Sequence, residues 1–179
     1  FHPSGFPLDV LARLAEHPAA VAVEAGEPGL AADLIARVGG LVLINNPVDR
    51  LLPLMVQAGH PQYIGPGTYE AFQSPAQPLM VQYFQLLRAG KTLDAMDIYW
   101  RLAPLRGLFE SRLMSAAMLG CYHWPQLKYH QWLVGGNGGY TRQPCMKLHQ
   151  HEMEPIKFLL LQLGIEPRQP DQEFYCGRV

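Results

Sequence analysis

The sequence predicts an α/β protein whose first part alternates helices with strands and whose second part is helical. Three short apolar segments, at residues 19–23, 41–45 and 61–65, are bounded by turn residues, as buried strands are. Helix-periodic segments separate them, and this alternation with short connections favours parallel βαβ units. After about residue 68 no segment has a convincing strand pattern.

Each predicted helix of the first part has its own signal. Leucines at helical spacing mark residues 7–17, with Asp9 in the first turn, where an acid complements the helix dipole. The helix over residues 29–40 ends at two glycines, as helices commonly do. The helix over residues 48–59 contains Pro53, which has to lie near its first turn because proline has no backbone N–H.

The second part is predicted to consist of four helices and a tail. The helices are expected over residues 78–90, 92–120, 125–134 and 151–164. Pro104 should kink the second of them. The last segment, residues 165–179, is predicted to be an irregular tail.

Three parallel strands cannot close a barrel, which for eight strands needs about 200–250 residues or more. The sheet is therefore either small and open or part of a larger sheet. The chain opens at Phe1, without a methionine and directly in a Pro/Gly turn. This start favours the second option, in which further strand–helix units precede Phe1.

The composition excludes two classes of partner. The formal net charge is −1, from 14 basic and 15 acidic residues, so we expect no nucleic-acid partner. The apolar runs are too short for a membrane span, so no membrane partner is expected. Three dispersed cysteines fit a reducing compartment better than a disulfide framework, which predicts a cytoplasmic protein.

Several segments together resemble the dihydrodipicolinate synthase / N-acetylneuraminate lyase family. They are "LARLAEHP", "LVLINNPVDRLLPLMVQAG", "LLRAGKTLDAMDIYWRLAPLRGLFE" and "LKYHQWLVGGNGGYTRQP". The last segment is similar to a loop of the family at Lys128, Gly138, Gly139, Arg142 and Pro144. The segments occur in the family's order and extend over nearly the whole chain.

The resemblance implies a (β/α)8 TIM barrel, of which this chain carries about the second half, followed by a C-terminal helical bundle. Residues 1–67 would hold the last βα units, with strands 6–8, and residues 68–90 the final barrel helix. Residues 91–179 would form the C-terminal helical domain and tail. The resemblance also implies a homo-oligomer, a dimer or a tetramer.

Family members are class I lyases in which a lysine at the end of strand 6 forms a Schiff base with pyruvate or a related 2-oxo acid. The corresponding segment here is "AVAVEAG", which places Glu24 in the position of that lysine. A carboxylate cannot form an imine, because the step requires an amine nucleophile. Backbone contacts to the oxo acid would fall at Asn46 and at Tyr63 or Ile64, which are the candidate substrate-binding residues.

Two interpretations of Glu24 stay open. It is either a loop carboxylate at a barrel mouth without chemistry, or a general acid/base or polar ligand contact where barrels place their active sites. The leading hypothesis is a lyase-like protein that acts on or binds a 2-oxo acid or related small molecule without Schiff-base chemistry. One alternative is an active aldolase- or dehydratase-type lyase that uses residues outside this chain. Another is a non-catalytic binding or regulatory paralogue.

No cofactor or metal is expected. The segment "LHQHEMEP" contains His149, His151, Glu152 and Glu154, but Pro155 stands where the second histidine of an H-E-x-x-H motif belongs. Two histidines that are two residues apart point to different faces of a helix. Cys145 has no obvious base beside it and is predicted to be unreactive.

Overall fold

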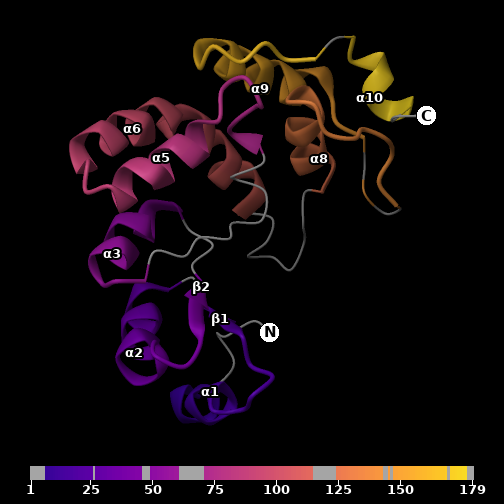
Figure 1. Ribbon diagram of the computed structural model, residues 1–179. Coiled ribbons are helices and arrows are strands. Elements are labelled where there is room, and N and C mark those ends of the chain that lie inside the picture. The colour runs from indigo at the N-terminus through magenta and orange to yellow at the C-terminus, as the bar shows by residue number, and fades with distance from the viewer. Residues whose placement is uncertain are drawn as a thin grey trace. The chain divides into compact units, whose positions relative to one another are not determined.

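The computed structural model describes residues 7–25, 27–45, 49–60, 71–114, 124–142, 145, 147–168 and 170–176. They belong to two compact units (Figure 1). The first comprises Phe1–Pro66 with Leu86–Thr92, and the second Gly67–Gln85 with Leu93–Val179. Within the described ranges, every helix is too short or too polar to span a lipid bilayer.

The first unit is built on a two-stranded parallel sheet. Its elements are α1 (Leu8–Ala15), β1 (Ala22–Glu24), α2 (Pro28–Val38), β2 (Leu43–Asn45), a 3-10 turn (Asp49–Leu51) and α3 (Leu52–Gln57). Val23 of β1 is in register with Ile44 of β2. The predicted parallel βαβ unit is thus confirmed for these two strands. The third predicted strand, residues 61–65, lies outside the described residues.

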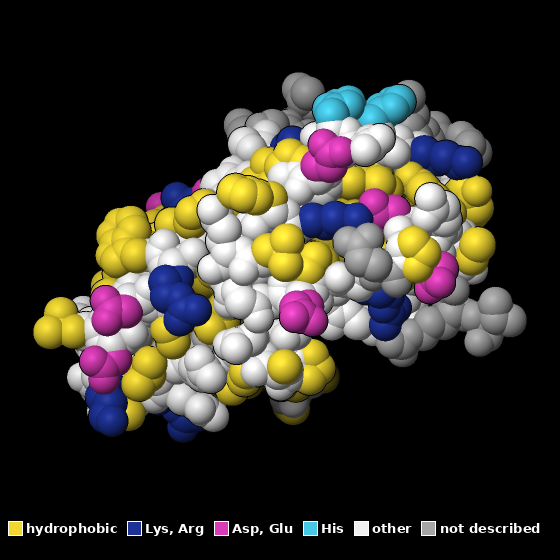
Figure 2. All heavy atoms as spheres, turned by 90° about the horizontal axis from the view of Figure 1, so that it is seen from above, with side chains coloured by type: hydrophobic (Ala, Val, Ile, Leu, Met, Phe, Trp, Pro, Cys, Tyr) yellow, Lys and Arg dark blue, Asp and Glu magenta, His cyan; other side chains and the backbone are white. Residues whose placement is uncertain are grey.

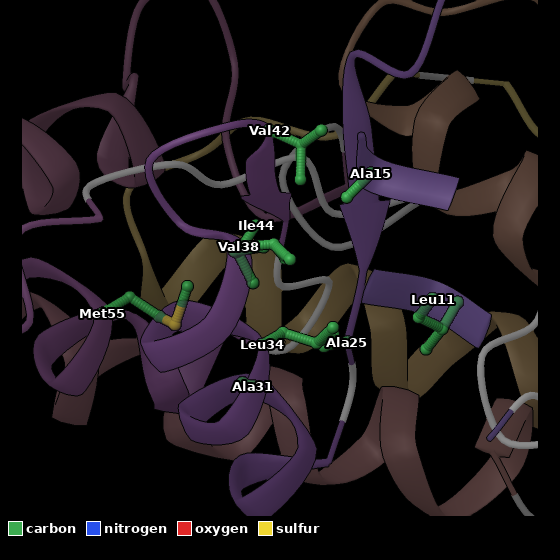
Figure 3. Close-up of a cluster of buried hydrophobic side chains, with 9 residues drawn as sticks. All are labelled: Leu11, Ala15, Ala25, Ala31, Leu34, Val38, Val42, Ile44 and Met55. Atoms are coloured by element: carbon green, nitrogen blue, oxygen red, sulfur yellow. The ribbon is translucent and has the colours of Figure 1, made fainter. Parts of the chain in front are cut away.

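The helices pack on one face of this sheet, where the core of the unit lies (Figure 3). The buried cluster consists of Leu11, Ala15, Ala25, Ala31, Leu34, Val38, Val42, Ile44 and Met55. Val23 packs against it, so both central strand residues point toward the helices. Leu34 and Ile44 are 0% exposed, and burying a side chain of this size contributes about 1.5–3 kcal/mol.

The first predicted strand begins too early and is less buried than expected. Residues 19–21 precede β1 in the structure, and Val21 is 70% exposed. On β2, Leu43 is 46% exposed. Side chains alternate along a strand, so Ala22 and Leu43 point to the face opposite the core. A parallel strand is buried on both sides only where both sides are covered, and here helices cover one.

The remaining helices are α5 (Leu79–Arg88), α6 (Thr92–Phe109), α8 (Trp124–Leu133), α9 (Gln150–Gln162) and α10 (Gln172–Cys176). The predicted helix that starts at Thr92 is confirmed, but α6 gives way at Glu110 to a five-residue π-helical turn. Gly90, between α5 and α6, has a φ of 74°, the left-handed conformation in which helices commonly end. The short helix α10 lies in the segment predicted to be an irregular tail.

An aromatic cluster holds α10 in the second unit. Tyr129 and Trp132 of α8 stack with ring centroids 6.0 Å apart, and the Phe174 ring lies 5.1 Å from that of Tyr129. The Tyr129 hydroxyl donates a 2.8 Å hydrogen bond to Asp171, which also pairs with Lys157 at 2.6 Å. Burial, followed by this hydrogen bond, raises the pKa of Tyr129, so its hydroxyl stays a neutral donor.

The glycine-rich loop after α8 is fixed to its surroundings through backbone groups. The Gly139 N–H donates to the carbonyl of Phe174, which joins the loop to α10. Lys128 donates from Nζ to the carbonyl of Tyr140 at 3.2 Å. Arg168 donates to the carbonyl of Gly136 at 3.1 Å. At these positions the loop is therefore a structural connection between helices.

Candidate functional site

The candidate site lies at the carboxyl ends of the two strands of the first unit. Glu24 is the last residue of β1 and is in register with Asn45, the last residue of β2. The Ala25 N–H donates a 2.8 Å hydrogen bond to the carbonyl of Asn45, which continues the parallel ladder past Glu24. The two polar residues are therefore neighbours across the same edge of the sheet.

Both residues point away from the helices. Val23 and Ile44 pack into the core, and side chains alternate, so Glu24 and Asn45 share the opposite face. That face has an apolar layer, Ala22 beside Leu43, followed by this polar pair at the strand ends. In a (β/α)8 barrel the face opposite the helices is the barrel interior, and catalytic groups lie at its C-terminal end.

The Glu24 side chain is exposed, whereas Asn45 is 7% exposed. The Glu24 carboxylate forms no hydrogen bond or ion pair with any other described residue. The Glu24 carboxylate therefore contributes no polar interaction that stabilises the described part of the chain. The prediction of a buried strand that ends at Glu24 is wrong, because Ala22 and Glu24 are exposed. No described residue covers the face of the sheet that carries them.

A neighbouring carboxylate, Glu27, has a structural role. It is the N-cap of α2, and its side chain accepts hydrogen bonds from the N–H groups of Gly29 at 2.9 Å and Leu30 at 2.6 Å. These two bonds lower the pKa of Glu27, since they favour the charged carboxylate. Glu27 thereby fixes the start of α2 at Pro28, four residues after Glu24.

Asp49 is a buried acid that sequence reasoning missed. It opens the 3-10 turn that follows β2 and is 2% exposed. Buried carboxylates are uncommon unless they have a partner, and Asp49 has one. Its signal in the sequence was an acid soon after a strand and at the start of a helix, a pattern that equally indicates an ordinary helix terminus.

The other predicted site residues cannot be placed beside Glu24. Asn46, Tyr63 and Ile64 lie outside the described residues. Their proposed contacts with a substrate therefore stay predictions.

The histidine pair of the second unit differs from its prediction. The His149 and His151 rings stack, with centroids 5.6 Å apart and an interplanar angle of 14°. His149 has an extended backbone as the N-cap of α9, so the helical spacing does not apply to it. Figure 2 shows histidine side chains together at the surface. Across the described positions, no three side chains of metal-binding type come together.

Comparison with known proteins gives matches to solved structures. No family model and no curated protein matches the sequence. A protein from Pseudomonas aeruginosa provisionally described as a dihydrodipicolinate synthetase matches 90% of this chain and 53% of its own, with 18% identity and a TM-score of 0.65. A monomeric dihydrodipicolinate synthase variant matches 88% of this chain and 50% of its own, with 14% identity and a TM-score of 0.68.

A third match is the chloride-inhibited dihydrodipicolinate synthase from Acinetobacter baumannii in complex with pyruvate. It covers 88% of this chain and 50% of its own, with 19% identity and a TM-score of 0.61. The chain thus spans about half the length of the structures that it matches. At these identities the likeness concerns the fold, and it supports the resemblance that the sequence motifs predict. The chain shares its fold with about half of a dihydrodipicolinate synthase structure.

Proposed function

We propose that this chain forms part of a dihydrodipicolinate synthase-type barrel that binds a 2-oxo acid or a related small molecule at the strand ends. We propose further that residue 24 takes no part in Schiff-base chemistry. One observation carries the proposal: Glu24 ends β1 on the helix-free face, in register with Asn45. This is the position in the fold where a barrel enzyme places groups that contact its substrate.

The chemistry of the two side chains fits this role. An asparagine amide supplies N–H donors of the kind that bind a carboxylate. Glu24 has no amine with which to form an imine, but a positioned carboxylate moves protons as a general acid or base. In a 2-oxo acid the acidic C–H bonds lie next to the carbonyl group, so Glu24 would accept a proton there. The pyruvate bound to the Acinetobacter enzyme supports the choice of this substrate class.

The exposed apolar residues beside the site fit a larger barrel. Val21 and Leu43 are 70% and 46% exposed, and Leu41 is 61% exposed. Neighbouring strands of a closed barrel, or a second copy of the protein, would cover surface of this kind. We therefore include a homo-oligomer in the proposal, and light scattering of the purified protein measures it directly.

The decisive experiment is borohydride trapping with pyruvate, read by intact mass and peptide mapping on the protein that contains this chain. A lysine amine adds to the carbonyl with loss of water, and hydride then reduces the iminium to a stable secondary amine. We expect no adduct on the wild type. Glu24→Lys should gain one adduct, mapped to residue 24, because the new amine would lie at the strand end.

Glu16→Lys is the matched control, since it places a lysine at an exposed position after α1, away from the strand ends. It should gain no adduct. An adduct on the wild type would sink the loss-of-imine proposal and point to a lyase that uses another amine. No adduct on a folded Glu24→Lys variant, together with no thermal stabilisation of the wild type by pyruvate, would overturn the 2-oxo acid site.

A further inference from the structure

A cavity of about 300 Å³ lies within the second compact unit, between the glycine-rich loop and α10. Its walls include Pro125, Tyr140, Thr141, Lys147 and Tyr175. The volume is at the lower end of the range of about 300–1,000 Å³ that is typical of small-molecule sites. All of these residues belong to the second unit, so the cavity is a property of that unit alone.

The walls of the cavity are held in place by contacts that do not involve a ligand. The Tyr175 hydroxyl donates a 3.1 Å hydrogen bond to the carbonyl of Leu148. Lys128 donates a hydrogen bond to the backbone carbonyl of Tyr140. The ring centroids of Tyr140 and Tyr175 lie 5.3 Å apart, with an interplanar angle of 34°. The Gly139 N–H joins the loop to α10. A site built in advance in this way loses little ordering entropy when a ligand binds.

Lys147 places a positive charge at the cavity. Its Nζ lies 4.9 Å from the centre of the Tyr140 ring and 5.3 Å from that of Tyr175. These two rings are its contacts, and it forms no ion pair with another described residue. Lys157, by contrast, is paired with Asp171 at 2.6 Å. Burial raises the pKa of Tyr175, and the Lys147 charge opposes this shift only in part, so the hydroxyl stays neutral at pH 7.

We propose that this cavity binds a small organic anion with a flat ring, such as an aromatic carboxylate. The carboxylate would pair with the Lys147 ammonium and accept a hydrogen bond from the Thr141 hydroxyl. The ring would pack against Tyr140 and Pro125, because aromatic rings prefer stacked or edge-on contact with one another. This proposal does not depend on the function proposed for the strand ends, whose residues belong to the other unit.

The test uses 4-fluorobenzoate as probe, with binding followed by ¹⁹F line broadening on the full chain. For a ligand of this size we expect a dissociation constant on the order of 1 mM. Two control compounds should each bind at least tenfold more weakly than 4-fluorobenzoate. Acetate has the charge without the ring, and 4-fluorobenzylamine has the ring with the opposite charge. Absence of benzoate binding at 10-fold excess over that constant would overturn the proposal, and so would equal binding of the amine.

Two variants of one residue separate charge from packing. Lys147→Met keeps most of the length of the side chain and removes its charge, and it should weaken benzoate binding at least tenfold. Lys147→Arg keeps the charge and should bind within about threefold of the wild type, since both cations pair with a carboxylate. Lys91→Met removes a lysine from the other unit and should bind as the wild type does. Unchanged binding by Lys147→Met, or equal loss in both Lys147 variants, would contradict the proposal.

Discussion

The Tyr129 hydroxyl donates a 2.8 Å hydrogen bond to Oδ1 of Asp171, while Oδ2 of the same carboxylate pairs with Lys157 at 2.6 Å. One carboxylate therefore joins α8 and α9 to the segment that leads into α10. The side chains of Lys157 and Asp171 are only 17% and 33% exposed, so water screens the pair less than it screens a pair at the surface.

Replacing Asp171 with asparagine should destabilise the second unit. The substitution removes the carboxylate charge that pairs with the half-buried Lys157 ammonium, which should cost about 1–3 kcal/mol of unfolding free energy. All three tryptophans, Trp100, Trp124 and Trp132, lie in the second unit, so urea unfolding followed by tryptophan fluorescence measures it. Glu154→Gln alters an exposed side-chain hydrogen bond on α9 and should stay within about 0.5 kcal/mol of the wild type. Equal effects of the two substitutions would contradict this account.

His130 should make the second unit sensitive to acid. Its ring is 0% exposed, and burial, followed by the charge of Arg112, lowers its pKa to about 3. In the unfolded chain a histidine has a pKa near 6.5. The unfolded state therefore binds more protons between these two values, so the stability from this group is complete above pH 6.5 and falls as the pH drops toward 3.

The expected slope from His130 is at most about 1.4 kcal/mol per pH unit in that window. In the variant His130→Leu this contribution should vanish, so urea midpoints measured from pH 7 down to pH 4.5 should fall less steeply than those of the wild type. His151→Gln changes an exposed ring on α9 and should keep the wild-type slope. Parallel curves for the wild type and His130→Leu would refute the assignment.

Gly138 should not tolerate a side chain. A Cβ at this position would clash with the carbonyl oxygen of Phe174 and lie 2.8 Å from Cδ1 of Trp132. We expect Gly138→Ala to cost about 1–3 kcal/mol, because the loop and the aromatic cluster would have to shift. Gly107→Ala is the matched control in the same unit, since nothing lies within 4 Å of the added atom. There, alanine should stabilise α6 by about 0.5–1 kcal/mol.

Glu27 should protect the backbone N–H groups in the first turn of α2. Glu27→Ala removes the acceptor for the Gly29 and Leu30 N–H groups, so hydrogen exchange of these two amides should speed up. Glu27→Gln keeps one acceptor oxygen and should give a smaller change. The pKa of Glu27 is lowered in the fold, so in the wild type this protection is present above pH 4.5 and is lost as the pH falls below it. Exchange that is the same in all three proteins would rule out the cap.

The sequence predicted correctly the elements whose start, end or pairing depends on residues within or next to the element. Pro53 lies at the start of α3, as its missing N–H requires, and α5 is followed by Gly90 in a left-handed conformation. The parallel pairing of β1 and β2 followed from the alternation of strands and helices. Each of these depends on chemistry within a few residues of the element itself.

The features that the sequence did not predict depend on distant contacts. The helix α10 has only five residues and no periodicity to reveal it; it is held by Phe174, whose ring packs against Tyr129 and Trp132. The stacking of His149 on His151 depends on where α9 begins, which sequence patterns fix poorly. At the candidate site, the position of Glu24 at a strand end was predictable, whereas its pairing with Asn45 required the strand register.

The exposed position of Glu24 also has an evolutionary consequence. Its side chain shares no contact with the buried cluster, which is formed from the other face of the sheet. Under the function proposed above, an exchange at this one codon would alter which reactions the strand ends can support while the core keeps its packing. On that proposal, a lineage with this fold would gain or lose amine chemistry at residue 24 in one mutational step, because the exposed side chain adds nothing to the packed core.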